Sequence, residues 1–221
     1  MARPKPQSAI RFPLSSVFGT EANVRVVREL SRHGGQLDAS TLVKRTKLTL
    51  PSVLNALSIL VAFGILDEVG SGRTRLFSMS RISPLNTSIL SLFDAEEARF
   101  NAVIDAVREC VASLGNKVMA AWIYGSVARG EDRAESDLDV VLIAQDEDVS
   151  SVQGGSVDFL LARGEALSFS PSVNTLSRAD LRRLMENNDP LWKAFAADAL
   201  VVSGPRPTSI FQATPDKETP A

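Results

Sequence analysis

The sequence predicts an α+β protein in two parts that are joined by helices. We expect three short helices and two strands in the first part, and a mixed β-sheet flanked by helices in the second. Charge divides in the same way. Residues 1–80 carry 11 Lys and Arg against 5 Asp and Glu, a net charge of +6, whereas residues 81–221 carry 13 against 21, a net charge of −8. A basic first part beside an acidic remainder indicates that only the first part meets a polyanion.

We expect five segments along the chain. They are a flexible basic arm over residues 1–17, a first domain over 18–80, linker helices over 81–116, a second domain over 117–204 and a disordered tail over 205–221. The arm and the tail are rich in proline and polar residues, which bury too little apolar surface to fold.

Composition excludes several classes of protein. The single cysteine, Cys110, rules out an intrachain disulfide framework and suits a reducing compartment. The single histidine, His33, precedes Gly34 at an expected helix end and gives little support for Ser–His–Asp catalysis. Because the chain has no run of 18 apolar residues and no apolar signal core, we expect a cytoplasmic protein that does not enter a membrane.

Apolar spacing and capping residues predict the elements of the first domain. Gly34 ends the first helix, Asp38 is a good N-cap for the second, and Pro51 suits the first turn of the third. The expected helices span about residues 20–33, 39–46 and 51–63, and the expected strands span residues 65–69 and 75–79.

This order of elements resembles the winged helix-turn-helix domains of ArsR- and MarR-type regulators, including the run A-L-x-x-L-x-x-x-G-I-L at residues 56–66. The resemblance implies a transcriptional regulator that binds double-stranded DNA, as a homodimer that suits palindromic half-sites. We expect base and phosphate contacts from a recognition helix, its neighbouring helix and a wing, through Lys44, Arg45, Lys47, Thr49, Ser52, Asn55, Arg73 and Arg75. A winged helix used only for dimerisation or protein contact is the alternative.

The linker is expected to contain two segments. Residues 84–93 form a short helix or a connector, and Asp94 with Glu97 matches a capping box that starts a second helix over residues 95–114. The apolar stripe of this second helix packs against a core or pairs two subunits.

Residues 125–139 combine a phosphate cradle with a metal site. Residues 120–124 suit a buried strand, after which Gly125-Ser126 turns the chain into a short helix whose free N–H groups favour a phosphate. Asp137 and Asp139 then enter a second apolar strand. Because alternate residues of a strand share a face, their carboxylates form a ligand pair for Mg²⁺.

The stretch fits the pattern G-S-x-x-R-G-x(5)-S-D-x-D and resembles the signature of the DNA polymerase β-like nucleotidyltransferases. The resemblance implies a small mixed sheet with helices, bound Mg²⁺ and a nucleoside triphosphate, and transfer of a nucleotidyl group. The residues that it assigns to the nucleotide are Gly125, Ser126, Arg129, Gly130 and Ser136. Asp137 and Asp139 are implied as the catalytic metal ligands.

Members of this superfamily usually supply a third carboxylate from the next strand, and two alignments compete for it here. In one, residues 156–161 are that strand and Asp158 is the third catalytic acid. In the other, residues 147–164 form a crossover helix and residues 167–176 form a strand without an acid. The length of the connection favours the second alignment.

The sequence therefore predicts a DNA-binding regulator that carries a nucleotidyltransferase domain. If the third acid is absent, the domain is instead a nucleotide sensor without catalysis, in which bound nucleotide changes the affinity for DNA. One half of a toxin–antitoxin pair is a further alternative.

Overall fold

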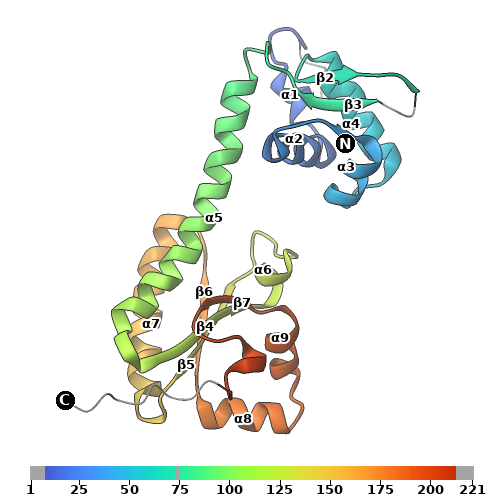
Figure 1. Ribbon diagram of the computed structural model, residues 1–221. Coiled ribbons are helices and arrows are strands. Elements are labelled where there is room, and N and C mark those ends of the chain that lie inside the picture. The colour runs from blue at the N-terminus through green and yellow to red at the C-terminus, as the bar shows by residue number, and fades with distance from the viewer. Residues whose placement is uncertain (1–7, 73–74, 213–221) are drawn as a thin grey trace, which may run out of the picture. The chain divides into compact units, whose positions relative to one another are not determined.

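The computed structural model describes residues 8–72 and 75–212 and divides into two compact units, Met1–Glu97 and Ala98–Ala221 (Figure 1). The long helix α5, Asn86–Leu114, supplies its first part to one unit and the remainder to the other. Within the described ranges, no helix combines the length and the apolar character that crossing a membrane requires.

The first unit contains the helices and strands that the sequence predicted, with two short additions. Its elements are α1 Leu14–Val17, α2 Glu21–His33, β1 Leu37–Asp38, α3 Ala39–Thr46, α4 Leu50–Ala62, β2 Leu66–Val69 and β3 Leu76–Met79. The additions are α1 and β1, which are too short to leave a clear periodic pattern. The side chains of Thr20, Asp38 and Thr49 cap α2, α3 and α4 by accepting hydrogen bonds from backbone N–H groups.

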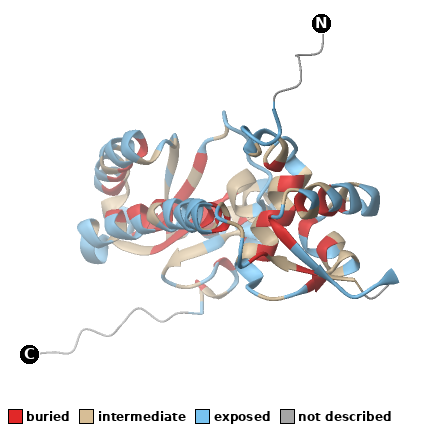
Figure 2. Cartoon of the chain, turned by 90° about the horizontal axis from the view of Figure 1, so that it is seen from above, coloured by how far each residue is buried: buried red, intermediate tan, exposed pale blue. Residues whose placement is uncertain are grey.

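The strands of the first unit pair in the order β1-β3-β2, all antiparallel. Phe77 of β3 is opposite both Leu37 and Glu68, and its ring is buried in the core between the sheet and the helices. Figure 2 shows that the helices turn their buried residues inward and their exposed residues outward. The core consists mainly of aliphatic side chains from α2, α3, α4 and the first part of α5.

The predicted break before residue 95 is wrong, because α5 runs without interruption from Asn86 to Leu114. Asp94 therefore lies inside the helix and does not cap it. The stretch contains neither glycine nor proline, so nothing in the backbone stops the helix, and burial of Ile89 and Phe93 stabilises its first part.

The second unit is a mixed sheet with strand order β6-β5-β4-β7, in which only the β5–β6 pair is parallel among the described strands. The sheet strands are β4 Val118–Tyr124, β5 Leu138–Ala144, β6 Pro171–Ser177 and β7 Leu200–Ser203. The helices are α6 Gly125–Arg129, α7 Val149–Leu167, α8 Arg178–Glu186 and α9 Pro190–Asp198, with short 3₁₀ turns at Gly115–Lys117, Asp146–Asp148 and Pro207–Ser209.

Both faces of this sheet are covered, and the central strands β4 and β5 are apolar except for Asp139 near the start of β5. Ile123 and Val140 belong to the core beneath α5 and α7, whereas Trp122 and Val141 belong to the core beneath α8 and α9. Figure 1 shows α7 on one side of the sheet and α8 and α9 on the other. The alternation places Asp139 on the same face as Val141.

Of the two alignments for the strand after β5, the crossover-helix alignment is confirmed. Residues 149–167 form α7, and the parallel strand that follows it is β6. Asp158 is therefore an exposed residue of α7 and not the acid of a sheet strand, which corrects its assignment as a third catalytic carboxylate. Two adjacent glycines at 154 and 155 did not prevent the helix, because its buried side packs against the sheet.

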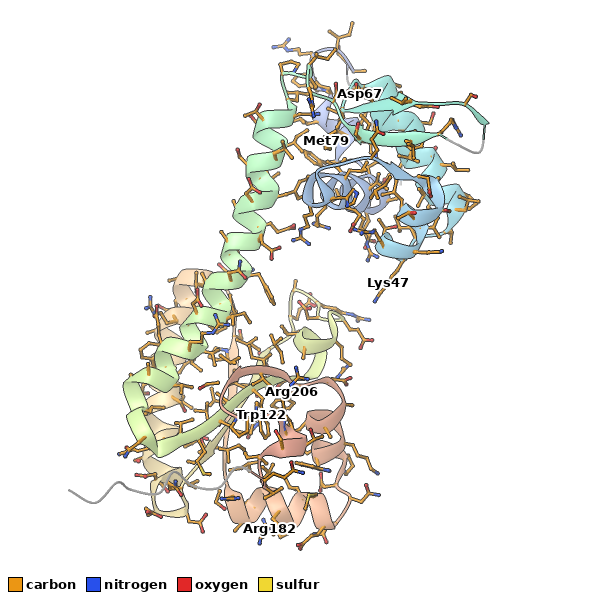
Figure 3. All side chains as sticks on the ribbon, viewed as in Figure 1. Lys47, Asp67, Met79, Trp122, Arg182 and Arg206 are labelled. Carbon is orange, nitrogen blue, oxygen red and sulfur yellow. The ribbon has the colours of Figure 1, made fainter. Side chains whose placement is uncertain are left out.

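The chain is ordered further toward both ends than the sequence predicted. Val17, placed in the flexible arm, is fully buried, and the segment after residue 204 packs through Ile210, which is also fully buried. The indole Nε1 of Trp122 donates a hydrogen bond to the carbonyl oxygen of Pro205 at 2.9 Å. Figure 3 labels Trp122 at the sheet. Residues 1–7 of the predicted arm and residues 213–221 of the predicted tail lie outside the described residues.

We predict that Ile210→Ala lowers the free energy of unfolding by about 2–5 kcal/mol, because it removes a buried side chain that the core cannot refill. Urea denaturation followed by circular dichroism measures this change. Leu161→Ala is the control, since half of that side chain is exposed, and it should change stability by no more than about 0.5 kcal/mol. Equal effects of the two substitutions would contradict a packed role for the segment after residue 204.

Candidate functional site

The turn that follows β4 brings the backbone against a carboxylate of β5. Gly125 has a φ of +73°, a conformation that side-chain-bearing residues rarely adopt. A Cβ atom at this position would overlap Oδ2 of Asp139 and lie 3.2 Å from its Cγ. Glycine is therefore required on two counts, and its missing side chain leaves the backbone open beside the carboxylate.

Asp137 and Asp139 lie at the start of β5, at the end of the strand nearest this turn. Asp137 directly precedes the strand and is exposed, whereas Asp139 is half-buried and is paired in register with Tyr124 of β4. The buried Leu138 lies on the face of the sheet opposite Asp139. Asp137 is near enough for its negative charge to act on Asp139.

The environment of Asp139 raises the pKa of its carboxyl group. Burial is the main cause and the negative charge of Asp137 adds to it, while a hydrogen bond from Ser172 and the charge of Arg129 act in the opposite direction. The raised pKa shows that this carboxylate lacks full compensation for its lost hydration, which a bound cation would supply.

The sequence did not assign the polar side chains of Tyr124, Ser172 and Asn174 to the site. Ser172 of β6 is paired in register with Asp139, and Asn174 lies two residues further on the same face. The Asn174 side-chain amide donates a hydrogen bond to the Tyr124 hydroxyl at 2.9 Å. The strand therefore presents Ser172 and Asn174 where the superfamily resemblance leads us to expect a third carboxylate. Two-residue alternation along β6 was the only signal that pointed to Asn174.

The other residues predicted to bind the nucleotide surround the same turn. Ser126 follows Gly125 in α6 and is half-buried, while Arg129 ends α6 and donates from Nε to Glu131 at 2.8 Å. Gly130 ends this helix with a φ of +65°. The Ser136 hydroxyl accepts a hydrogen bond from the backbone N–H of Arg133 at 3.0 Å, so it shapes the loop that delivers Asp137.

The residues present fit a magnesium ion that shares its ligands with a phosphate. Mg²⁺ is commonly held by one or two carboxylates together with waters and substrate phosphate oxygens. Asp137 and Asp139 supply two carboxylates, and the described part of the chain contains no group of three or more His, Cys, Asp or Glu residues that could enclose a metal. The site therefore suits a cation that arrives with a nucleotide better than a permanently enclosed metal.

A cleft of about 900 Å³ borders the loop between α6 and β5, but neither Asp137 nor Asp139 lines it. Gly130 and Ser136 line it from the loop, and Leu138 with Val103 places it on the α5 and α7 face of the sheet. Asp139 is on the other face and neither carboxylate lines the cleft, so this cleft is distinct from the place where metal chemistry is expected.

In the first unit, the structure leaves part of the predicted DNA-contacting set exposed. Lys44, Lys47 and Asn55 are exposed, and Figure 3 shows the Lys47 side chain projecting away from its unit. Arg45 is also exposed, but its guanidinium forms an ion pair with Glu29 at 2.6 Å.

The remaining predicted contacts have partners within the chain or are not described. The hydroxyls of Thr49 and Ser52 lie 2.9 Å apart at the start of α4 and hydrogen bond to each other. Arg75 forms an ion pair with Glu68 at 3.2 Å. Arg73 lies outside the described residues.

Comparison with protein families supports the motif in the second unit. Residues 109–195 match the family model described as polymerase beta, nucleotidyltransferase. The matched range includes the complete 125–139 motif and runs from the end of α5 into α9. The match supports the predicted nucleotidyltransferase domain over these residues. No match was found among curated proteins.

Several solved structures are similar over about half of the chain. A mutant of the toxin–antitoxin complex MntA–HpeT shares 13% identity, with 49% of this chain and 86% of that chain covered, at a TM-score of 0.36. A toxin–antitoxin structure with AMP-PNP shares 13% identity with the same coverage, at a TM-score of 0.33. NadR in complex with 4-hydroxyphenylacetate shares 18% identity, with 52% and 92% covered, at a TM-score of 0.33. All three TM-scores are below 0.5, so these similarities do not establish a function for this chain.

We predict that Asp139→Asn stabilises the protein at neutral pH in the absence of divalent cations. The folded-state pKa of Asp139 is raised, so its ionised form disfavours folding above that pKa, and the amide removes the penalty. As the pH falls through the raised pKa, the native carboxyl becomes neutral and the advantage of the variant disappears.

Thermal unfolding in the presence of a chelator, at neutral pH and at successively lower pH, measures this difference. Asp158→Asn, an exposed position on α7, is the matched control and should have no such pH-dependent effect. A variant that is less stable than the native protein at neutral pH would contradict the described environment of Asp139.

Proposed function

We propose that the second unit binds a magnesium–nucleoside triphosphate at the turn after β4 and the carboxylates of β5. The observation that carries this proposal is the close approach of Gly125 to Asp139, which places an open backbone turn directly beside a half-buried carboxylate. The family-model match over the same residues supports it.

Each residue of the site has a distinct part in binding. The backbone at Gly125 and the Ser126 hydroxyl contact the phosphates, where the absence of a side chain permits close approach. Asp137 and Asp139 hold the magnesium ion, which when bound neutralises charge on the phosphate oxygens. Arg129 lies close enough to Asp139 to lower its pKa and contributes positive charge on the same side.

Nucleotidyl transfer would need one more group than β6 provides. An acceptor hydroxyl oxygen forms a bond to the α-phosphorus, the bond from that phosphorus to the bridging oxygen of the β-phosphate breaks, and pyrophosphate leaves. The hydroxyl proton must pass to a base. The candidate positions on β6 are Ser172 and Asn174, and neither side chain is a base at neutral pH. This favours nucleotide sensing over transfer.

We further propose that the first unit is a winged helix-turn-helix domain that binds double-stranded DNA, so that the protein is a transcriptional regulator. The order of three helices and a hairpin, the net charge of +6 over residues 1–80 and the exposed Lys44 and Lys47 support this proposal. In this view nucleotide in the second unit biases the affinity of the first for its operator. Such bias requires a coupling free energy between the two sites, and a homodimer would match a palindromic operator.

The nucleotide proposal is tested by calorimetric titration of the full chain with Mg²⁺ and ATP, GTP, CTP or UTP. We predict metal-dependent binding of at least one nucleotide to the native protein and none to the Asp137→Ala/Asp139→Ala double variant, because the cation loses both ligands. Asp158→Ala is the matched control and should bind as the native protein does. Equal binding by the native protein and the double variant would exclude this site.

A substitution that adds the missing acid tests the geometry of β6. We predict that Ser172→Asp raises the affinity for Mn²⁺ alone on the order of tenfold, because a third carboxylate would join the pair at a position in register with Asp139. Manganese binding is measured by electron paramagnetic resonance. Ser168→Asp, which is exposed and outside the strand, should leave the affinity within about twofold of the native value. An unchanged affinity in Ser172→Asp would show that residue 172 does not face the metal.

A further inference from the structure

The helix expected to enter the major groove contains no charged residue. From Leu50 to Ala62, α4 reads L-P-S-V-L-N-A-L-S-I-L-V-A. Guanine is most often recognised by arginine or lysine at its O6 and N7 atoms, and cytosine by a carboxylate that accepts from its amino group. Neither type of side chain is present, so α4 lacks the usual means of reading a G·C pair.

The exposed side of α4 carries groups that suit A·T pairs instead. Val53, Ala56, Leu57 and Leu60 face the core, which turns Leu50, Leu54 and Asn55 outward. The two leucines are 49% and 38% exposed, although burying them would be favourable. Leucine has an apolar surface that can contact the 5-methyl group of thymine, and an asparagine amide can pair with N6 and N7 of adenine.

The hydroxyl groups of Thr49 and Ser52 contribute little to base recognition. Thr49 accepts from the backbone N–H of Ser52, and their hydroxyls hydrogen bond to each other, so both serve to cap the helix. Lys44 and Lys47, at the end of α3, flank the start of α4 with exposed positive charge that suits backbone phosphates rather than bases. The exposed leucines are therefore matched by their surroundings to DNA rather than to an uncharged partner.

We propose that α4 selects A·T base pairs, with Asn55 contacting adenine and Leu50 and Leu54 contacting thymine methyl groups. This inference rests on the proposed DNA-binding function and assigns the base composition of the site. Phosphate contacts supply affinity for any duplex, and the uncharged face of α4 supplies the preference among sequences.

The test uses the full chain and a selection from random duplex DNA, followed by fluorescence anisotropy at fixed, moderate salt. We expect the selected core to be A·T-rich and to bind about tenfold or more tightly than a G·C duplex of equal length. Replacing thymine by deoxyuridine, which removes only the methyl group, should weaken binding about fourfold at each contacted position.

Two variants separate base reading from folding. Leu54→Ala should abolish the sensitivity to deoxyuridine at its own position, with an unchanged circular dichroism spectrum because the side chain is partly exposed. Asn55→Arg should move the preference at one position toward guanine. Leu161→Ala in the second unit is the control and should behave as the native protein does.

The outcomes distinguish a failure of the A·T inference from a failure of the proposed DNA binding. Tight binding with no preference, with a G·C preference, or with no response to deoxyuridine would overturn the A·T inference while leaving DNA binding intact. Absence of binding to every duplex at low salt would overturn the DNA-binding function itself, and the inference with it.

Discussion

The contact between the Gly125 backbone and the Asp139 carboxylate is the constraint on which the second unit depends. β4 must end where its next residue has no side chain, because a Cβ atom there would occupy the space of the carboxylate oxygen. β5 must then return antiparallel, with Asp139 in register with Tyr124. The apolar cores on both faces of the sheet pack these two strands tightly, which holds the carboxylate beside the turn.

The side chains around Asp139 suit binding of a cation and a phosphate better than transfer of a nucleotidyl group. A carboxylate held partly out of water, with a second carboxylate beside it, is poised to gain from a divalent cation and a phosphate. The parallel strand β6 passes close to Asp139 but supplies Ser172, which donates a hydrogen bond, and Asn174, which holds the Tyr124 hydroxyl. If the second unit binds nucleotide without transferring it, as we propose, it can act on the proposed DNA-binding unit only through a coupled equilibrium.

Local signals in the sequence predicted much of the fold. Asp38, followed by apolar residues at helical spacing, predicted α3 with its actual ends, and the glycine-serine motif predicted the turn into the short helix α6 that follows β4. Each of these features is encoded within a few residues, where capping and alternation operate.

The features that the sequence did not reveal depend on contacts between distant residues. The continuity of α5 across Asp94 and the packing of Ile210 follow from burial, which a local capping pattern or a polar tail composition does not report. Asn174 belongs to the site because β6 pairs with β5 in one particular register. A shift of one residue would have turned that side chain to the opposite face.

The proposed binding of a metal–nucleotide complex beside Gly125 and Asp139 is tested most directly by a crystal structure of the full chain with Mn²⁺ and a non-hydrolysable nucleoside triphosphate. Diffraction is measured at the manganese absorption edge. We predict an anomalous peak bound by both Asp137 and Asp139, with the phosphates against the Gly125–Ser126 backbone. Nucleotide bound in a different place, or manganese bound away from these two carboxylates, would contradict it.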